Sequence, residues 1–245
     1  MANLMDLPVR LDIILPCYNP PTGWAEALPV SLGEVIAALR DTASVRLILV
    51  NDGSRQGVSE ADLQALRRAF PGMKYVAYAV NQGKGNALRE GAKVADGDFQ
   101  IYTDIDLPYQ TESVVQVFEA LRAGADVAAG VRDSEYYAHV PTLRRWISKL
   151  LRWMLRTFLR TKINDTQCGL KGFNAKGKEV FLRTHIKRFL FDMEFIYLAS
   201  NEQGLNLQAI PATLKPGVQF SKARMGILFR ESLNFLAIFW KGIWR

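Results

Sequence analysis

Residues 99–109, FQIYTDIDLPY, join a short aromatic and β-branched run to two aspartates that lie where the run ends. The run, 99–104, is bounded by polar residues and is typical of a buried β-strand. Similar runs occur along the first half of the chain at 10–15, 45–50, 74–80 and 126–131. Helical patterns separate them, near 24–40, 60–70, 85–95 and 111–122. This alternation predicts an α/β fold with a Rossmann-like, mostly parallel sheet covered by helices.

The polar motifs of the first half each follow a predicted strand directly. They are PCYNPP at 16–21, NDGS at 51–54, NQGKGN at 81–86 and DIDLPY at 104–109. In parallel α/β sheets, ligands bind beyond the carboxyl ends of the strands. The glycines of NQGKGN would bring backbone N–H groups to an anion at a helix N-terminus, and Lys84 adds a positive charge. Each motif alone is equally compatible with a plain turn, but their shared position predicts one ligand site.

Asp104 and Asp106 are the candidate metal ligands. Alternation along the strand end points both carboxylates away from Ile105. Two neighbouring carboxylates repel each other, and a hard divalent cation holds both of them ionised. Mg²⁺ or Mn²⁺ would keep coordination sites free for phosphate oxygens, which suits a diphosphate ligand. A bare Asp-x-Asp pair is also common in solvated turns, so the position after a strand is what favours a metal.

The pattern changes after residue 135. Helices are predicted over 142–160, 174–184, 191–203 and 226–244, and a strand over 205–213. No repeat or Gly/Ser linker interrupts the chain. We therefore expect one continuous domain with two functional halves, 1–135 and 136–245.

Charge is divided unevenly between these halves. The chain carries a net charge of +7, yet residues 1–135 hold 12 Lys/Arg against 18 Asp/Glu. Residues 136–164 hold seven Lys/Arg and no acidic residue, and residues 211–245 hold six against one. Blocks of one sign usually mark a polyanion or an anionic membrane surface as the partner.

Composition and motif positions exclude several classes of protein. Two cysteines, Cys17 and Cys168, and two distant histidines provide neither a disulfide framework nor a zinc site. We find no signal peptide and no apolar stretch of about 18 residues, so we expect a protein of the reducing cytoplasmic side. A dinucleotide fingerprint would follow the first strand, where PCYNPP stands instead, and a P-loop is absent. Dehydrogenases, kinases and ATPases are thereby excluded.

Taken in order, the motifs resemble those of family 2 glycosyltransferases, which have the GT-A fold. The motifs are LDIILPCYN, VNDGS, NQGKGNALREG, DIDLP, GVRDS and DTQCGLKGF, followed by FDMEF. The resemblance spans roughly residues 10–225 and points to dolichyl-phosphate glucosyltransferases and bacterial polyprenyl-phosphate glycosyltransferases. DTQCGLKGF, at 165–173, is the most specific motif. Pro20 stands where the family usually has Glu, and the transmembrane helices of many bacterial relatives are missing.

The resemblance implies a role for each matching residue. Pro16, Tyr18 and Asn19 would line the nucleotide pocket, Asp52 would read the base, and Lys84 would face the nucleotide. Asp104 and Asp106 would hold the metal and the diphosphate, and Arg132 would meet the acceptor phosphate or the pyrophosphate. Asp165 and Gln167 would border the sugar, and Asp192 and Glu194 would lie near the acceptor.

A basic amphipathic helix is predicted over 142–160 without reference to the family. Its basic face carries Arg145, Lys149, Arg152, Arg156 and Arg160, and its apolar face is rich in leucine and tryptophan. This pattern indicates an interfacial membrane helix, and a helix packed on the sheet with a solvated basic face is the alternative. Lys222 and Arg224 follow in the chain and would close on phosphate, and the helix at 226–244 would lie in the interface or pair two copies.

The sequence therefore predicts an inverting, metal-dependent enzyme on the inner face of the membrane. It would move a sugar, most simply glucose, from a UDP-sugar to a polyprenyl phosphate. Residues 1–135 would bind the nucleotide sugar, and residues 136–245 the acceptor and the membrane. The alternatives are transfer to a saccharide hydroxyl, with Asp192 as base, an anionic-membrane binding module, or a catalytically silent nucleotide-binding protein. Nucleic acid is not expected as a partner, because nothing in the basic block suggests base reading.

Overall fold

The structure is a computed structural model that describes residues 9–132, 163, 165–188 and 190–218. Its strands are β1 (Val9–Cys17), β2 (Ala43–Asp52), β3 (Lys74–Tyr78), β4 (Phe99–Tyr102), β5 (Val127–Arg132), β6 (Lys171–Phe173) and β7 (Leu207–Ala212). Its helices are α1 (Trp24–Leu39), α2 (Glu60–Ala69), α3 (Lys84–Val94), α4 (Thr111–Arg122), α7 (Ala175–Leu182) and α8 (Phe191–Asn201). The predicted helices 142–160 and 226–244 lie outside the described residues.

The described strands form one sheet in the order β3-β2-β1-β4-β6-β5-β7. All pairings are parallel except those of β6, which runs antiparallel to both β4 and β5. This mostly parallel sheet confirms the predicted α/β class. The sequence did not predict β6, because three residues are too few to show a periodicity.

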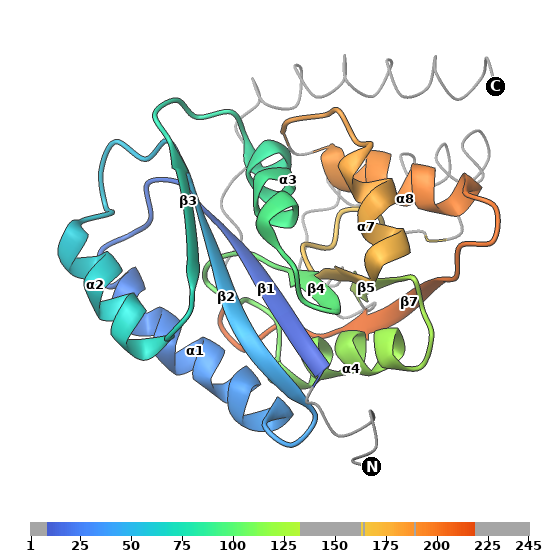
Figure 1. Cartoon of the computed structure of the whole chain (residues 1–245), viewed down its shortest axis with the longest axis horizontal. Coiled ribbons are helices and arrows are strands. Elements are labelled where there is room, and N and C mark those ends of the chain that lie inside the picture. Colours follow the sequence, from blue (N-terminus) through green and yellow to red (C-terminus); the bar gives the residue numbers. More distant parts are fainter. Residues whose placement is uncertain (1–8, 133–162, 164, 189, 219–245) are drawn as a thin grey trace, which may run out of the picture.

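Helices cover both faces of the sheet (Figure 1). Leu11, Ile13 and Leu15 of β1 pack in one core with α1, α2 and α4. Ile14, between them, packs in a second core with α3, α7 and α8. Because successive side chains of a strand point to opposite faces, a strand buried on both faces reads as one continuous apolar run. This explains why the strands were recognisable in the sequence.

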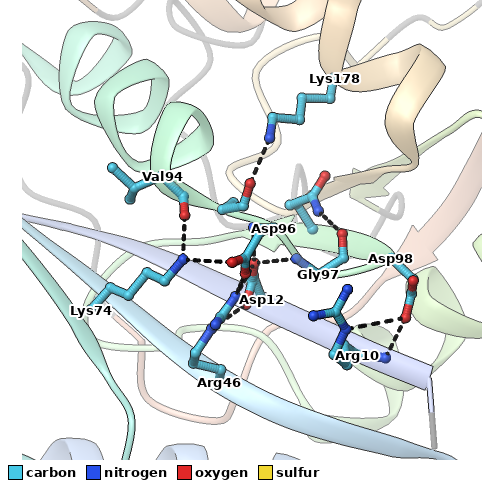
Figure 2. Close-up of polar contacts among 11 residues, drawn as sticks. Arg10, Asp12, Arg46, Lys74, Val94, Asp96, Gly97, Asp98 and Lys178 are labelled. Carbon is cyan, nitrogen blue, oxygen red and sulfur yellow. Dashed lines mark hydrogen bonds and ion pairs between the residues drawn. The ribbon is translucent and has the colours of Figure 1, made fainter. Parts of the chain in front are cut away.

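A cluster of four charged residues and one backbone amide, which we call the amino-edge clasp, lies near the starts of β1, β2, β3 and β4 (Figure 2). It consists of Asp12, Arg46, Lys74, Asp96 and Gly97. The Asp12 carboxylate is 1% exposed and accepts from Arg46 Nε at 2.8 Å and from the Gly97 amide at 2.8 Å. Asp96 pairs with Arg46 and, at 3.1 Å, with Lys74. The clasp thus fixes the turn from α3 into β4 against β1, β2 and β3, and so positions the strand that leads into Asp104.

Candidate active site

The predicted polar motifs meet at the carboxyl edge of the sheet. β1 pairs with β2 along its whole length, from Val9 opposite Ala43 to Cys17 opposite Asn51. The loops that follow these two strands therefore begin side by side. Because β6 is antiparallel, the segment before it reaches the same edge at which β4 and β5 end.

The loops after β1 and β2 are tied together by Asn19. Its amide donates to Ser54 Oγ at 2.9 Å, and its side-chain oxygen accepts from the Arg55 amide at 2.9 Å. Asn19 has a φ of 45°, in a region that asparagine tolerates better than most residues. Tyr18 beside it is 49% exposed, so its ring is open to a ligand. Pro16 is half-buried at the end of β1.

Asp52 fixes the loop after β3. Its carboxylate is 3% exposed and accepts from the Tyr78 hydroxyl at 2.6 Å, from Asn81 Nδ2 at 2.7 Å and from the Gly83 amide at 2.9 Å. A Cβ on Gly53, where φ is 69°, would lie 2.5 Å from the Asn81 nitrogen, so glycine is required for this contact. Through these contacts, Asp52 shapes the turn after β3. A contact between Asp52 and a nucleotide base stays a prediction.

Lys84 and Asp104 form an ion pair at the centre of the edge. Lys84 is the first residue of α3, and its Nζ lies 2.5 Å from Asp104 Oδ1. Burial alone would lower the pKa of Lys84, but the charges of Asp104, Asp192 and Asp106 outweigh it and raise that pKa. Asp106 is exposed, and partial desolvation together with the charge of Asp104 raises the pKa of its carboxyl. The two aspartates therefore interact, as their spacing predicts.

The DTQCG segment, 165–169, packs directly on the Asp104 carboxylate. A Cβ on Gly169 would lie 2.7 Å from Asp104 Oδ2 and 3.5 Å from Lys84 Nζ. The Gly169 amide donates to the Tyr109 hydroxyl at 2.8 Å, which joins this segment to the loop after β4. Only glycine allows so close an approach. The structure thus brings the DIDLPY and DTQCGLKGF motifs into one site.

Arg132 and Asp165 form a bidentate pair beside this contact. Arg132 Nε donates to Asp165 Oδ2 at 2.8 Å, and Nη2 donates to Oδ1 at 2.7 Å. Burial would raise the pKa of Asp165, but the hydrogen bonds and charge of Arg132 hold it below its usual range. The Tyr109 hydroxyl lies within electrostatic reach of both Arg132 and Asp104, so the pair borders the same site.

Gln167 carries a buried donor whose partner is missing among the described residues. Its Nε2 is inaccessible to solvent and meets no acceptor there. Buried polar groups are normally hydrogen-bonded, so this donor is an exception, and the place of Gln167 beside the sugar stays a prediction.

A buried polar cluster lies behind the ion pair of Lys84 and Asp104. The Asp192 carboxylate, 4% exposed, accepts from Lys171 Nζ and from the Tyr102 hydroxyl, each at 2.7 Å. Lys171 is fully buried and also donates to the Cys168 carbonyl, so it anchors the DTQCG segment. The sequence analysis missed Lys171 and Tyr102, although a lysine within an apolar strand is a signal that marks a buried partner. The role of Asp192 as a base stays a prediction, and its contacts favour a positioning role.

Glu194, two residues further along α8, makes different contacts. It is 7% exposed and accepts from the amides of His185 and Ile186 at 2.8 and 2.7 Å. It therefore holds the loop between α7 and α8 against its own helix. Its predicted place near the acceptor stays untested.

Comparison with known proteins agrees with this geometry. The family model described as glycosyl transferase family 2 matches residues 12–188, which is more than half of the chain. The chain belongs to glycosyltransferase family 2. The match begins in β1 and ends after α7, so it includes every site residue described above except Asp192 and Glu194.

Relatives and structural neighbours of this glycosyltransferase come from several kingdoms. The dolichyl-phosphate beta-glucosyltransferase of Dictyostelium discoideum is 24% identical over 97% of this chain and 77% of its own length. The undecaprenyl-phosphate 4-deoxy-4-formamido-L-arabinose transferase of Photorhabdus laumondii is 25% identical over 72% of this chain and 52% of its own length. Mannosyl-3-phosphoglycerate synthase from Rubrobacter xylanophilus superposes with a TM-score of 0.66 at 13% identity, covering 94% of this chain and 73% of its own. A mannosyltransferase from Pyrobaculum calidifontis, solved with GDP-Man and Mn²⁺, superposes with a TM-score of 0.53 at 13% identity, covering 86% and 59%. These neighbours confirm the GT-A fold.

The residues of this family 2 glycosyltransferase suit a divalent cation held by few protein ligands. In the described part of the chain, no group of three or more His, Cys, Asp or Glu side chains could hold a metal. Asp104 and Asp106 supply hard carboxylate oxygens, and the Lys84 ammonium already places a positive charge on Asp104. Mg²⁺ and Mn²⁺ are typically held by one or two carboxylates together with substrate phosphates, so the donor set fits. The predicted phosphate ligands Lys222 and Arg224 lie outside the described residues.

Proposed function

We propose that the protein is an inverting glycosyltransferase that moves glucose from UDP-glucose to a polyprenyl phosphate. One observation carries the proposal: Asp104, Lys84 and the DTQCG segment converge at the carboxyl edge of the sheet, with Arg132 held beside them. Such a site offers charge for two phosphate-bearing ligands, a nucleotide diphosphate and an acceptor phosphate.

The donor half of the proposal rests on the loops after β1, β2 and β3. Tyr18 presents an exposed ring for a base, and the turn at 81–83 leads into the N-terminus of α3, where backbone N–H groups favour an anion. Asp104 and Asp106 would hold Mg²⁺ or Mn²⁺, which supplies Lewis-acid stabilisation of the departing diphosphate when bound. The neighbour from Pyrobaculum calidifontis, solved with GDP-Man and Mn²⁺, supports a cation of this kind. The buried amide of Gln167 would donate to the sugar.

The acceptor half rests on charge rather than on a base. A phosphate monoester is an anion at neutral pH, so its oxygen attacks the anomeric carbon without losing a proton, and the bond to the diphosphate oxygen breaks. Arg132, oriented by Asp165, would hold this phosphate and neutralise developing charge. Transfer to a saccharide hydroxyl would need a base, whereas Asp192 is buried against Lys171. The names of the relatives from Dictyostelium discoideum and Photorhabdus laumondii support a lipid phosphate acceptor.

A lipid acceptor implies work at a membrane surface. The structure describes no helix that is both long and apolar enough to cross a bilayer. Within this proposal, the basic amphipathic segment 142–160, which lies outside the described residues, would bind the inner face of the membrane.

The test is product formation by the purified protein. It is incubated with Mg²⁺, a panel of UDP- and GDP-sugars and a short-chain polyprenyl phosphate, and lipid products are identified by mass spectrometry. We expect a polyprenyl-phosphate glucose from UDP-glucose, with NMR showing inverted anomeric configuration. Absence of glycolipid with every donor, together with transfer to a saccharide acceptor, would refute the lipid phosphate assignment.

A further inference from the structure

The contact between Lys84 and Asp104 occupies the carboxylate that the proposed function assigns to a cation. Lys84 Nζ lies 2.5 Å from Asp104 Oδ1, and the Lys84 side chain is only 20% exposed. An ammonium group and a divalent cation both require the electrons of this oxygen. A carboxylate oxygen has lone pairs for both, but an ammonium group and a divalent cation held on one oxygen lie close enough to repel each other, so each weakens the binding of the other.

The DTQCG segment limits the movement of the Asp104 carboxylate on one side, whereas 42% of the side chain is exposed. A Cβ added at Gly169 would lie 2.7 Å from Oδ2, so the backbone of the DTQCG segment closes that side. That backbone is itself held, because the Gly169 amide donates to Tyr109 and the Cys168 carbonyl accepts from buried Lys171. A cation that approaches Oδ1 from the exposed side therefore meets the charge of Lys84 and competes with it for this carboxylate.

Lys84 has a second place to go when a donor is present. It is the first residue of α3, so its side chain starts at the N-terminus of that helix, where the Gly83 amide already donates to Asp52 at 2.9 Å. An anionic diphosphate at this N-terminus would attract the ammonium group, and a lysine side chain is flexible enough to change partner.

We propose that Lys84 and the divalent cation exchange on Asp104, and that the donor diphosphate drives the exchange by drawing Lys84 to itself. The inference rests on the proposed function, because it takes a nucleoside diphosphate as the ligand. Its consequence is positive coupling: the cation binds weakly to the free protein and tightly once the diphosphate has taken Lys84. By linkage, the cation must strengthen diphosphate binding by the same factor.

The experiment measures MnCl₂ binding by calorimetry and by the free-Mn²⁺ electron paramagnetic resonance signal, with and without UDP. Wild type is compared with Lys84→Met and Lys84→Gln, and circular dichroism establishes that each variant is folded. Lys187→Met is the matched control, because Lys187 is exposed and contacts the same turn through Gln82 Oε1 at 3.2 Å. It removes an equal charge nearby without uncovering Asp104.

Without UDP, both Lys84 variants should bind Mn²⁺ roughly tenfold more tightly than wild type, in the usual range of coupling between two sites. UDP should tighten Mn²⁺ binding in every variant, because its phosphates are themselves ligands, and the tightening should be roughly tenfold greater in wild type and in Lys187→Met than in the Lys84 variants. Equal Mn²⁺ affinity of wild type and the Lys84 variants without UDP would overturn the exchange. If Lys187→Met also bound Mn²⁺ roughly tenfold more tightly than wild type without UDP, the exchange would be overturned too, because a long-range charge effect would explain both variants.

Glycolipid synthesis by the wild type is measured in parallel, so that the two proposals can fail separately. A protein that makes glycolipid but shows equal Mn²⁺ affinities keeps the proposed function and loses only the exchange. A protein that binds no Mn²⁺ with UDP, and makes no glycolipid, loses both.

Discussion

At the scale of single residues, the site depends on two carboxylates with different surroundings. Asp104 is half-buried and lies beside Lys84 and Gly169, whereas Asp106 is exposed and has its pKa raised by partial desolvation and by the charge of Asp104. A pair of this kind gains from a divalent cation, because the cation removes the repulsion that each carboxylate imposes on the other.

Asp104→Asn and Asp106→Asn should each abolish sugar transfer, because each removes a charge from the cation and diphosphate site. EDTA should do the same to the wild type, and added Mg²⁺ or Mn²⁺ should restore it. The measurement is glycolipid formation from UDP-glucose, with Asp41→Asn, on the exposed turn after α1, as the control. Full activity in EDTA would contradict the role of the metal.

Gly169→Ala should lower turnover roughly tenfold or more, as a displacement of about 1 Å in a reacting group can do. The added Cβ would lie 2.7 Å from Asp104 Oδ2 and must push that carboxylate aside. Gly33→Ala is the matched control, since a Cβ there meets nothing within 4 Å and alanine favours the interior of α1. Equal turnover of the two variants, in a steady-state assay, would show that Asp104 tolerates movement.

Arg132→Ala should weaken transfer to lipid phosphate by roughly 2–4 kcal/mol in activation free energy, if its guanidinium stabilises charge on the phosphates. Asp165→Asn should reproduce part of this loss, because it removes the anion that orients Arg132 through contacts of 2.8 and 2.7 Å. Arg122→Ala, an exposed arginine of α4, serves as control. Wild-type rates for Arg132→Ala with every acceptor would reduce Arg132 to a structural residue.

At the scale of elements, both edges of the sheet are secured by charge. The amino-edge clasp holds the turn between α3 and β4 (Figure 2). At the carboxyl edge, Lys84 pairs with Asp104 and Arg132 pairs with Asp165. Hydrogen bonds from Arg46 and Lys74 lower the pKa of Asp96 to about 2, against an ordinary value of 3.8. A carboxyl whose pKa is lowered by folding stabilises the fold at pH values above its ordinary pKa. That stability is lost as the pH falls toward the lower pKa of the folded state.

Asp96→Asn should therefore melt below wild type at pH 7, and the difference should shrink as the pH falls from about 4 toward 2. Melting temperatures from circular dichroism across this range test the prediction. Asp41→Asn, again the control, removes a carboxyl from the exposed pair with Arg40 and should follow wild type throughout. A difference between Asp96→Asn and wild type that is independent of pH would exclude titration of Asp96 as the cause.

At the scale of the whole molecule, charge differs between the proposed donor half, 1–135, and the proposed acceptor half, 136–245. Residues 1–135 are net acidic, whereas 136–164 contain seven basic and no acidic residues. A long polyprenyl tail cannot leave the bilayer, so an enzyme that uses it must bring its site to the phosphate. Each basic residue near an anionic surface contributes about 1 kcal/mol, so under the proposed function the basic segment would suffice to localise the protein.

Wild type should sediment with liposomes that contain anionic lipid, and changing Arg145, Lys149, Arg152 and Arg156 together to glutamate should release it. Binding should weaken with salt, because the attraction is screened. In the control variant, four exposed arginines of the described part are changed to glutamate, and this variant should still sediment. They are Arg40, Arg67, Arg68 and Arg122. Equal sedimentation of wild type and the first variant would assign 142–160 to a role in the fold.

The sequence by itself determined the class of fold, most element bounds and the position of each polar motif after a strand. Predicted helices at 24–40 and 111–122 agree with α1 at Trp24–Leu39 and α4 at Thr111–Arg122. The reason is local: strand and helix periodicity, and the burial of both sheet faces, are written into neighbouring residues.

The tertiary structure alone decided which side chains meet. Lys84 with Asp104, Arg132 with Asp165 and Lys171 with Asp192 are pairs of residues 20, 33 and 21 positions apart. Each pair requires atoms within about 3 Å, a distance set by the strand order and by the antiparallel insertion of β6 between β4 and β5. A strand of three residues is too short to show a periodicity. The place of β6 is instead fixed by its pairing with two strands that are distant in the chain. Local sequence could therefore name most residues of the site, though not Lys171, and could not say which side chains meet.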